Sequence, residues 1–352
     1  SLGPVNAFRN LTWEGAIQPA HTFGTATGEY LVSWNSSTRL RVRRVNPPLP
    51  APTLTEVGFV TVSSFSDPPD APALGSSTPL DTVDKRLMMA IYRNGFLWTC
   101  HTIAVSGRAG CRWYQVNAAA HSLVQSGTVS DATKYYFFPS LMVNQAGHVA
   151  MAFTGSSSSQ YAACYFTGRR ADDPAGEMAA PVQYKAGTAP QNNIDGYGRN
   201  RWGDYSYTTL DPTDRTTIWT IQEYGHLTDV WGTYVATLRF SFPDCNGNGV
   251  DDACDISCGA AGGPCDVPGC GGSLDCDGNG IPDECDGARP GDLDCDGIVD
   301  FNDVNPFVLA LSSQADYEAA YPNCRWLNAD CNRDCLVTFE DINPFVGLLS
   351  GK

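Results

Sequence analysis

The 352-residue sequence contains no apolar run of about 18 residues, the length that a membrane-spanning helix needs. It contains no Cys-x-x-Cys pair, which argues against zinc and c-type haem sites. Its five histidines are scattered without metal-ligand spacing, and neither a Gly-x-Ser-x-Gly elbow nor a P-loop occurs. These absences leave no motif that identifies a catalytic class, and we expect a protein that is not an enzyme.

Basic residues are scarce in the last third of the chain. Residues 244–352 contain 21 Asp and Glu against 4 Lys and Arg, a net charge of −17, whereas the first 243 residues contain 17 and 18. An acidic segment of this kind is unsuited to nucleic acid, and it predicts a site for cations.

Cysteines are concentrated in the same segment, which holds 11 of the 14. Dense cysteine in a loop-rich segment is typical of an oxidising compartment. We therefore expect a secreted, extracellular protein. Because the sequence starts at Ser1 without an apolar leader, we expect the signal peptide to have been removed already.

The acidic residues of the stretch DLDCDGIVDFND (292–303, loop three) follow a fixed spacing. Positions 1, 3, 5, 9 and 12 are aspartates, and Gly297 stands at position 6. This is the oxygen-ligand spacing of an EF-hand-type calcium loop, in which position 7 contributes a backbone carbonyl. The spacing recurs in residues 244–255 (loop one), 275–286 (loop two) and 330–341 (loop four), where Cys335 replaces the position-6 glycine.

The sequence therefore predicts about four Ca²⁺ sites. The predicted ligands are Asp244, Asn246, Asn248, Val250, Asp252 and Asp255 in loop one; Asp275, Asp277, Asn279, Ile281, Asp283 and Asp286 in loop two; Asp292, Asp294, Asp296, Ile298, Asp300 and Asp303 in loop three; and Asp330, Asn332, Asp334, Leu336, Thr338 and Asp341 in loop four.

A short amphipathic helix is predicted after each of the last two loops. Apolar residues spaced i, i+3, i+4 and i+7 form its inward face, namely Val304, Phe307, Val308 and Leu311, and again Ile342, Phe345, Val346 and Leu349. The duplicated loop–helix segment 291–352 resembles a dockerin type I module, and loops one and two resemble thrombospondin type 3 calcium repeats. The dockerin resemblance implies attachment through exposed helix residues. A cohesin partner is left open, because these helices carry Asn-Pro-Phe rather than polar recognition residues.

Disulfides are predicted from local spacing. Cys100 and Cys111 flank a turn and would tie a hairpin. Positions 2 and 11 would pair within loop one (Cys245 with Cys254) and within loop two (Cys276 with Cys285). Cys295 would pair with Cys324, and Cys331 with Cys335. The pairing of Cys164, Cys258, Cys265 and Cys270 is left open, and a link from Cys164 to the acidic segment is one alternative.

Residues 1–243 are predicted to be all-β, because short segments rich in Val, Ile, Thr and aromatic residues alternate with turn residues. Units of ~40–50 residues favour a β-propeller, small or incomplete, over a sandwich. Two stretches, FPSLMVN…GHVAMAFTGSS…YAACYFTGR and RWGDYS…DPTD…IWTIQEY…WGTYVATL, resemble bacterial sialidase-like (BNR-type) propellers. The catalysis of that family is not implied, since its arginine triad cannot be assembled and its Asp-box motif is absent.

One polar group within this region could contact a ligand. Charged residues beside aromatic ones suit sugar recognition. The polar residues of this group are Asp195, Arg201, Asp204 and Glu223, and the aromatic residues beside them are Trp202 and Tyr205. The simpler interpretation, which we prefer, is a structural ion pair between Arg201 and Asp204.

Together these features predict three parts: a β-propeller-like domain (1–243), two disulfide-clipped calcium repeats (244–290) and a dockerin-like module (291–352). We predict a calcium-binding structural or interaction protein whose C-terminal segment attaches the propeller to a partner, either another protein or its own copies. The alternatives are a dockerin-tethered glycan-binding or glycoside-hydrolase-like propeller and a calcium-dependent adhesin.

Overall fold

The computed structural model describes residues 8, 14–48, 51–240, 243–261 and 265–351. The chain divides into two compact units, Ser1–Phe240 and Ser241–Lys352, called the N-terminal and C-terminal units below. Among the described residues, no helix is long and apolar enough to cross a membrane.

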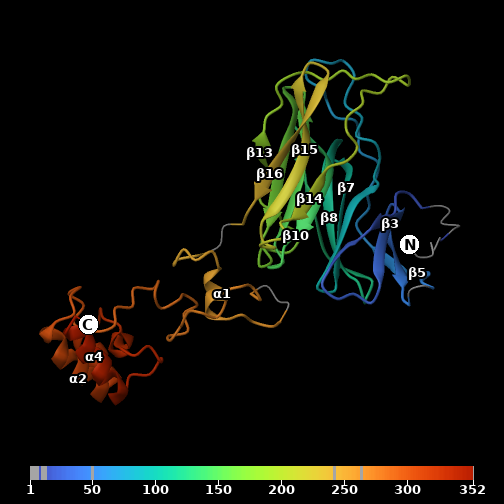
Figure 1. The fold of residues 1–352 in the computed structure, drawn as a ribbon. Coiled ribbons are helices and arrows are strands. Elements are labelled where there is room, and N and C mark those ends of the chain that lie inside the picture. The colour runs from blue at the N-terminus through green and yellow to red at the C-terminus, as the bar shows by residue number, and fades with distance from the viewer. Residues whose placement is uncertain (1–7, 9–13, 49–50, 241–242, 262–264, 352) are drawn as a thin grey trace, which may run out of the picture. The chain divides into compact units, whose positions relative to one another are not determined.

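The described strands of the N-terminal unit form four sheets (Figure 1). The first contains β1 (Gln18–Pro19), β3 (Glu29–Ser36), β4 (Arg39–Asn46) and β5 (Thr53–Thr61). The second contains β2 (His21–Phe23), β6 (Leu87–Arg93), β7 (Phe96–Val105), β8 (Arg108–Asn117) and β9 (Ser122–Val129). The third contains β10 (Tyr135–Val143), β11 (Val149–Ser157), β12 (Gln160–Arg169) and β13 (Val182–Lys185), and the fourth contains β14 (Tyr207–Leu210), β15 (Ile218–Leu227) and β16 (Val230–Leu238).

Neighbouring strands within each sheet are antiparallel, apart from the parallel pair β2–β6. Tight turns such as Asn94-Gly95, where both residues have positive φ, match the twist of the strands they join. Successive up-and-down sheets are the blade pattern of a propeller. The predicted fold class is confirmed: the chain is mainly β and propeller-like, with a small helical C-terminal part.

The sequence pattern accounts for how the sheets pack. In β15 the residues Ile218, Thr220 and Gln222 are buried, while the side chains between them are exposed or partly so, as expected for a strand with one buried face. β10 and β11 are buried on both faces, which is why they contain few polar side chains. The stacked rings of Trp98 and Trp113, 5.9 Å apart, lie in the largest core cluster.

The C-terminal unit is mostly loop with short helices. These are α1 (Asp252–Ile256), η1 (Phe301–Asp303), α2 (Val304–Ser312), α3 (Gln314–Ala320), η2 (Trp326–Ala329), η3 (Phe339–Asp341) and α4 (Ile342–Leu349). The helices predicted after loops three and four are α2 and α4, and their Phe307 and Phe345 rings stack at 4.1 Å in the core of this unit. The prediction that Val308, Ile342 and Val346 face inward is wrong, because all three are exposed.

Candidate metal centres in the C-terminal unit

The four acidic loops share one backbone geometry. Positions 4 and 6 both have left-handed φ in every loop, which lets the chain fold back sharply on its own carboxylates. Position 4 is Gly247, Gly278, Cys295 and Arg333 in turn, and position 6 is Gly249, Gly280, Gly297 and Cys335. At Cys335 the φ of 68° is one that non-glycine residues rarely adopt. Loop four therefore keeps the turn of the other loops although its position 6 is a cysteine.

The same two hydrogen bonds recur inside all four loops. The position-6 N–H donates to the position-1 carboxylate over 3.0, 3.0, 3.1 and 2.8 Å in loops one to four. The position-7 N–H donates to the position-5 side-chain oxygen over 2.8, 2.7, 2.8 and 2.9 Å. These bonds turn the acidic side chains toward the centre of each loop.

Loops three and four also share a second set of bonds. One oxygen of Asp303 accepts the N–H groups of Leu293 and Asp294 at 2.6 and 3.1 Å, and one oxygen of Asp341 accepts those of Cys331 and Asn332 at 2.8 and 3.0 Å. The other oxygen of each closes a capping box at the start of the following helical turn. These two loops are one structural unit used twice.

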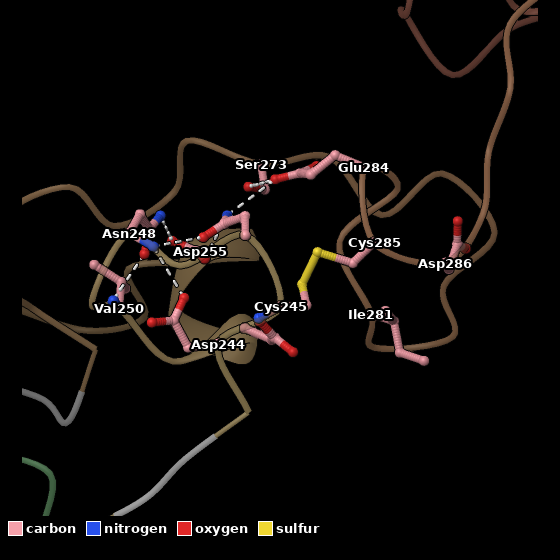
Figure 2. Close-up of a disulfide and its surroundings, with 12 residues drawn as sticks. Asp244, Cys245, Asn248, Val250, Asp255, Ser273, Ile281, Glu284, Cys285 and Asp286 are labelled. Carbon is pink, nitrogen blue, oxygen red and sulfur yellow. Dashed lines mark hydrogen bonds between the residues drawn. A yellow bond between two sulfur atoms is a disulfide. The ribbon is translucent and has the colours of Figure 1, made fainter.

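Loops one and two are built differently. Their position-9 carboxylates, Asp252 and Asp283, accept the N–H at position 2. Their position-12 carboxylates accept the position-5 amide instead. The Asn248 amide donates to Asp255 at 2.8 Å (Figure 2), and the Asn279 amide donates to Asp286 at 3.1 Å.

In loops one, two and three, each loop brings three of its own carboxylates together. Oxygens of Asp244, Asp252 and Asp255, of Asp275, Asp277 and Asp283, and of Asp292, Asp294 and Asp303 lie within 4.8 Å of one another. Loop four shows no such trio among the described residues, and its Asp330 lies beside Cys276 and Cys335, which are disulfide-bonded and offer no thiolate.

Loop three offers the clearest site for a cation. Asp292 is 2% exposed, and its Oδ1 is buried without a hydrogen-bond partner. Burial, followed by the neighbouring carboxylates, raises the pKa of Asp294. An unpartnered buried oxygen facing like charges is costly unless a cation completes it, and oxygen-only donors suit a hard divalent ion. The acidic clusters can therefore hold metal ions.

The disulfides correct most of the predicted pairings. Cys295 is bonded to Cys324, the pairing that the sequence predicted. Cys245 is bonded to Cys285 of loop two (Figure 2), Cys254 to Cys265, Cys258 to Cys270, and Cys276 to Cys335. The loops close around their own carboxylates, so the position-2 sulfurs point outward to other segments and do not meet position 11.

The remaining predicted bridges are wrong as well. Cys331 is free because its expected partner Cys335 belongs to Cys276. Cys100 and Cys111 are free and buried, since they are not register partners: Cys100 lies opposite Trp113, and Cys111 lies opposite Thr102. Cys164 is also free and buried, so it makes no link to the acidic segment. Five disulfides are typical of a protein that matures in an oxidising environment.

Arg325 is a site residue that sequence reasoning missed. It donates to Asp277 at 2.7 Å and to Asp286, and it lies 3.9 Å from Asp283, so that it contacts three of the predicted ligands of loop two. No local sequence pattern predicts this contact, because Arg325 is 39 residues from Asp286 and 48 residues from Asp277.

The predicted ligand surface in the N-terminal unit is only partly a surface. Arg201 pairs with Asp81 at 2.7 Å and with Asp204 at 3.2 Å, in agreement with the structural interpretation. Trp202 is 3% exposed and belongs to a core cluster, which removes it from any ligand surface. Tyr205 is exposed, and its hydroxyl accepts from Arg86 at 3.4 Å.

Glu223, a member of the predicted polar group, is a partly buried carboxylate. Glu223 accepts the N–H of Gly203 at 3.0 Å, and a Cβ on Gly203 would collide with that carboxylate. Burial raises the pKa of Glu223, and the charge of Asp204 adds to the effect.

No protein-family model and no curated protein matches the chain. Solved structures with partial similarity include an alpha-L-arabinofuranosidase from Lactobacillus brevis (11% identity, 61% of this chain, 69% of that chain, TM-score 0.32). They also include a GH43_12 protein from a capybara gut metagenome (10% identity, 67% of this chain, 42% of that chain, TM-score 0.37). A GH43 endo-arabinanase from Bacillus licheniformis matches at 13% identity over 62% of this chain and 72% of that chain, with a TM-score of 0.29. Similarity this low carries no argument about activity.

Proposed function

We propose that the protein is secreted and binds calcium, and that its C-terminal unit attaches the propeller-like unit to a partner. The observation that carries the calcium assignment is the buried, unpartnered Oδ1 of Asp292 among Asp294 and Asp303. When bound, calcium supplies a divalent charge that offsets the carboxylates of each loop. We expect affinities typical of extracellular modules, on the order of 10⁻⁴ M or somewhat tighter.

The residues that would hold calcium are those predicted from the spacing. Loop three offers the most complete set, because Asp292, Asp294 and Asp303 already converge. Loop four supports a weaker site, since its position 9 is Thr338, whose hydroxyl already caps η3 by accepting from Glu340 at 3.2 Å. The assignment is tested by calorimetric titration of the full chain with CaCl₂, and a chain that takes up no calcium at millimolar concentration contradicts it.

The attachment part of the proposal is supported by a duplicated exposed apolar surface. It consists of equivalent residues from the two loop–helix repeats, namely Ile298 and Leu336, Phe301 and Phe339, and Val308 and Val346. The rings of Phe301 and Phe339 are 83% and 79% exposed, and both residues lie in the turn that begins at the calcium loop. Exposed apolar patches of this kind mark interaction sites.

The attachment is tested by sedimentation velocity of the full chain in millimolar calcium and in chelator. Self-association that needs calcium and is lost in a Phe301→Ser/Phe339→Ser variant identifies the partner as a second copy. A monomer in both conditions refutes self-assembly and leaves a different protein as the partner, which calcium-dependent cross-linking at the same two positions would then capture.

Glycan hydrolysis is the second candidate. It is favoured by Glu223, a partly buried carboxyl with a raised pKa, which lies near the ion pair of Arg201 and Asp204. A general acid requires a carboxyl of this kind. Turnover of an aryl-glycoside panel that disappears in Glu223→Gln would establish this candidate, and no turnover on any substrate would remove it.

A further inference from the structure

Arg325 places a positive charge inside the carboxylate set of loop two. Its Nη2 donates to Asp277 Oδ2 at 2.7 Å and lies 3.9 Å from Asp283 Oδ1, while its Nη1 donates to Asp286 Oδ1. These are positions 3, 9 and 12 of the loop. The Asp286 side chain is only 7% exposed and the Arg325 side chain 26%, so the carboxylate side of this ion pair is shielded from water.

Both oxygens of the position-12 carboxylate are therefore engaged by donors from the protein. Oδ1 of Asp286 accepts from Arg325, and Oδ2 accepts the side-chain amide of Asn279 at 3.1 Å. A calcium loop of this type uses its position-12 carboxylate as a ligand. An ion in loop two must consequently compete with the guanidinium for the same oxygens.

The backbone of Arg325 is held in place from both sides. Cys324 is bonded to Cys295 in loop three, and the Trp326 indole donates to the carbonyl of Ala310 in α2 at 3.0 Å. Loop two is tied to loop four through the bond between Cys276 and Cys335. The arginine is thus presented to the loop by the packed helical part of the unit.

We propose that Arg325 is an internal counter-cation that sets the calcium affinity of loop two below that of loop three. This proposal rests on the proposed calcium function, and it assigns the arginine the role of a tuning residue. Entry of calcium into loop two releases the guanidinium, which couples occupancy of that loop to the segment between α3 and η2 that carries Arg325. Among the described residues, the ion pair recorded for loop three joins Arg289 to Asp292 at 3.9 Å, and the Arg289 side chain is largely exposed.

The test is a calorimetric calcium titration of the full chain and of Arg325→Gln, with Arg325→Lys as a second variant that keeps the charge. Removing a unit charge this close is expected to tighten the weaker class of sites by about tenfold. Lysine keeps one point charge without the two-pronged geometry, so an intermediate affinity is expected. Arg289→Gln is the matched control, with a change of less than about twofold for loop three because that contact is long and exposed.

A second readout separates tuning from simple misfolding. In chelator, Arg325→Gln should weaken hydrogen-exchange protection of loop two, because it removes the charged donor to Asp286 and leaves the Asn279 amide, and calcium should restore protection. The tightening should also vanish when Asp275→Asn disables the loop. If calcium binds but its affinities are the same in wild type, Arg325→Gln and Arg325→Lys, the tuning role is refuted. A wild-type chain that binds no calcium at all refutes the proposed function instead.

Discussion

Replacing Asp292 with asparagine is expected to change the stability of the C-terminal unit in opposite directions with and without calcium. The substitution preserves shape and an acceptor for the Gly297 N–H, which donates to Asp292 Oδ2 at 3.1 Å. It removes one of three carboxylates whose oxygens lie within 4.8 Å.

The magnitude follows from that spacing. Two unit charges 4.8 Å apart repel by about 3.5 kcal/mol at an effective dielectric constant of about 20. Backbone donors to Asp303 and the solvent around Asp294 reduce this value, so we expect a gain of about 1–2 kcal/mol in chelator. In calcium at about 100 times the dissociation constant, the wild type gains about 2.7 kcal/mol from the bound ion. The variant loses that gain and becomes less stable than wild type by about 1 kcal/mol.

The assay is hydrogen-exchange mass spectrometry on peptides from loop three and α2, in the full chain, with 10 mM CaCl₂ or with chelator. Asp316→Asn is the matched control, because Asp316 is an exposed aspartate of the same unit outside the four loops. It should change protection equally little in both conditions. An Asp292→Asn variant that is destabilised to the same extent with and without calcium would refute the argument, since it would show that Asp292 is stabilising without an ion.

Three further predictions concern the core, the disulfides and pH. Phe307→Ala should destabilise the C-terminal unit by about 3–5 kcal/mol, because it opens a cavity beside the stacked Phe345 ring. Phe301 is exposed, so Phe301→Ala should change the free energy of unfolding by less than about 0.5 kcal/mol. Both values are measured by urea unfolding followed by hydrogen exchange. Loss of the bond between Cys276 and Cys335, which are 59 residues apart, should lower the free energy of unfolding by about 2–4 kcal/mol. The double variant Cys276→Ser/Cys335→Gly should be more stable than Cys276→Ser/Cys335→Ser by about 1 kcal/mol, because glycine adopts the 68° φ of position 335 without strain. The pKa of Glu223 is raised in the folded state, so its contribution to stability is fully present below the unfolded pKa and is lost as pH rises through the folded pKa. Glu223→Gln should therefore have a higher melting temperature than wild type at pH 7. A gain that does not shrink toward pH 4 in calorimetry would contradict this.

The acidic loops could be predicted from the sequence because their geometry is local. The alternating oxygens, the position-6 glycine and the apolar residue at position 7 lie within twelve residues, and the structure folds all four stretches into the same turn. The left-handed position 4 was missed, although Gly247 and Gly278 were visible signals. At Cys295 and Arg333 no residue type announces that conformation.

The disulfides and Arg325 could not be predicted in the same way, because they join segments distant in sequence. Spacing suggested that cysteines within one loop would pair, yet Cys245 reaches 40 residues to Cys285 and Cys276 reaches 59 residues to Cys335. The burial of individual side chains could not be predicted from the sequence either. Trp202 stands among charged residues in the sequence but packs into the core, and Val308 fits the helical apolar stripe but is exposed because the neighbouring repeat covers only part of it.

The bond between loop two and loop four has a consequence for biogenesis. In the secretion that we propose, the thiol of Cys276 emerges long before Cys335, whereas Cys285 emerges only nine residues later. The next cysteine to emerge after Cys276 is therefore a wrong partner, and a premature bond within loop two would have to be reshuffled once residue 335 arrives. The C-terminal unit should depend on a disulfide isomerase, and a host that supplies only an oxidase should accumulate a mispaired form.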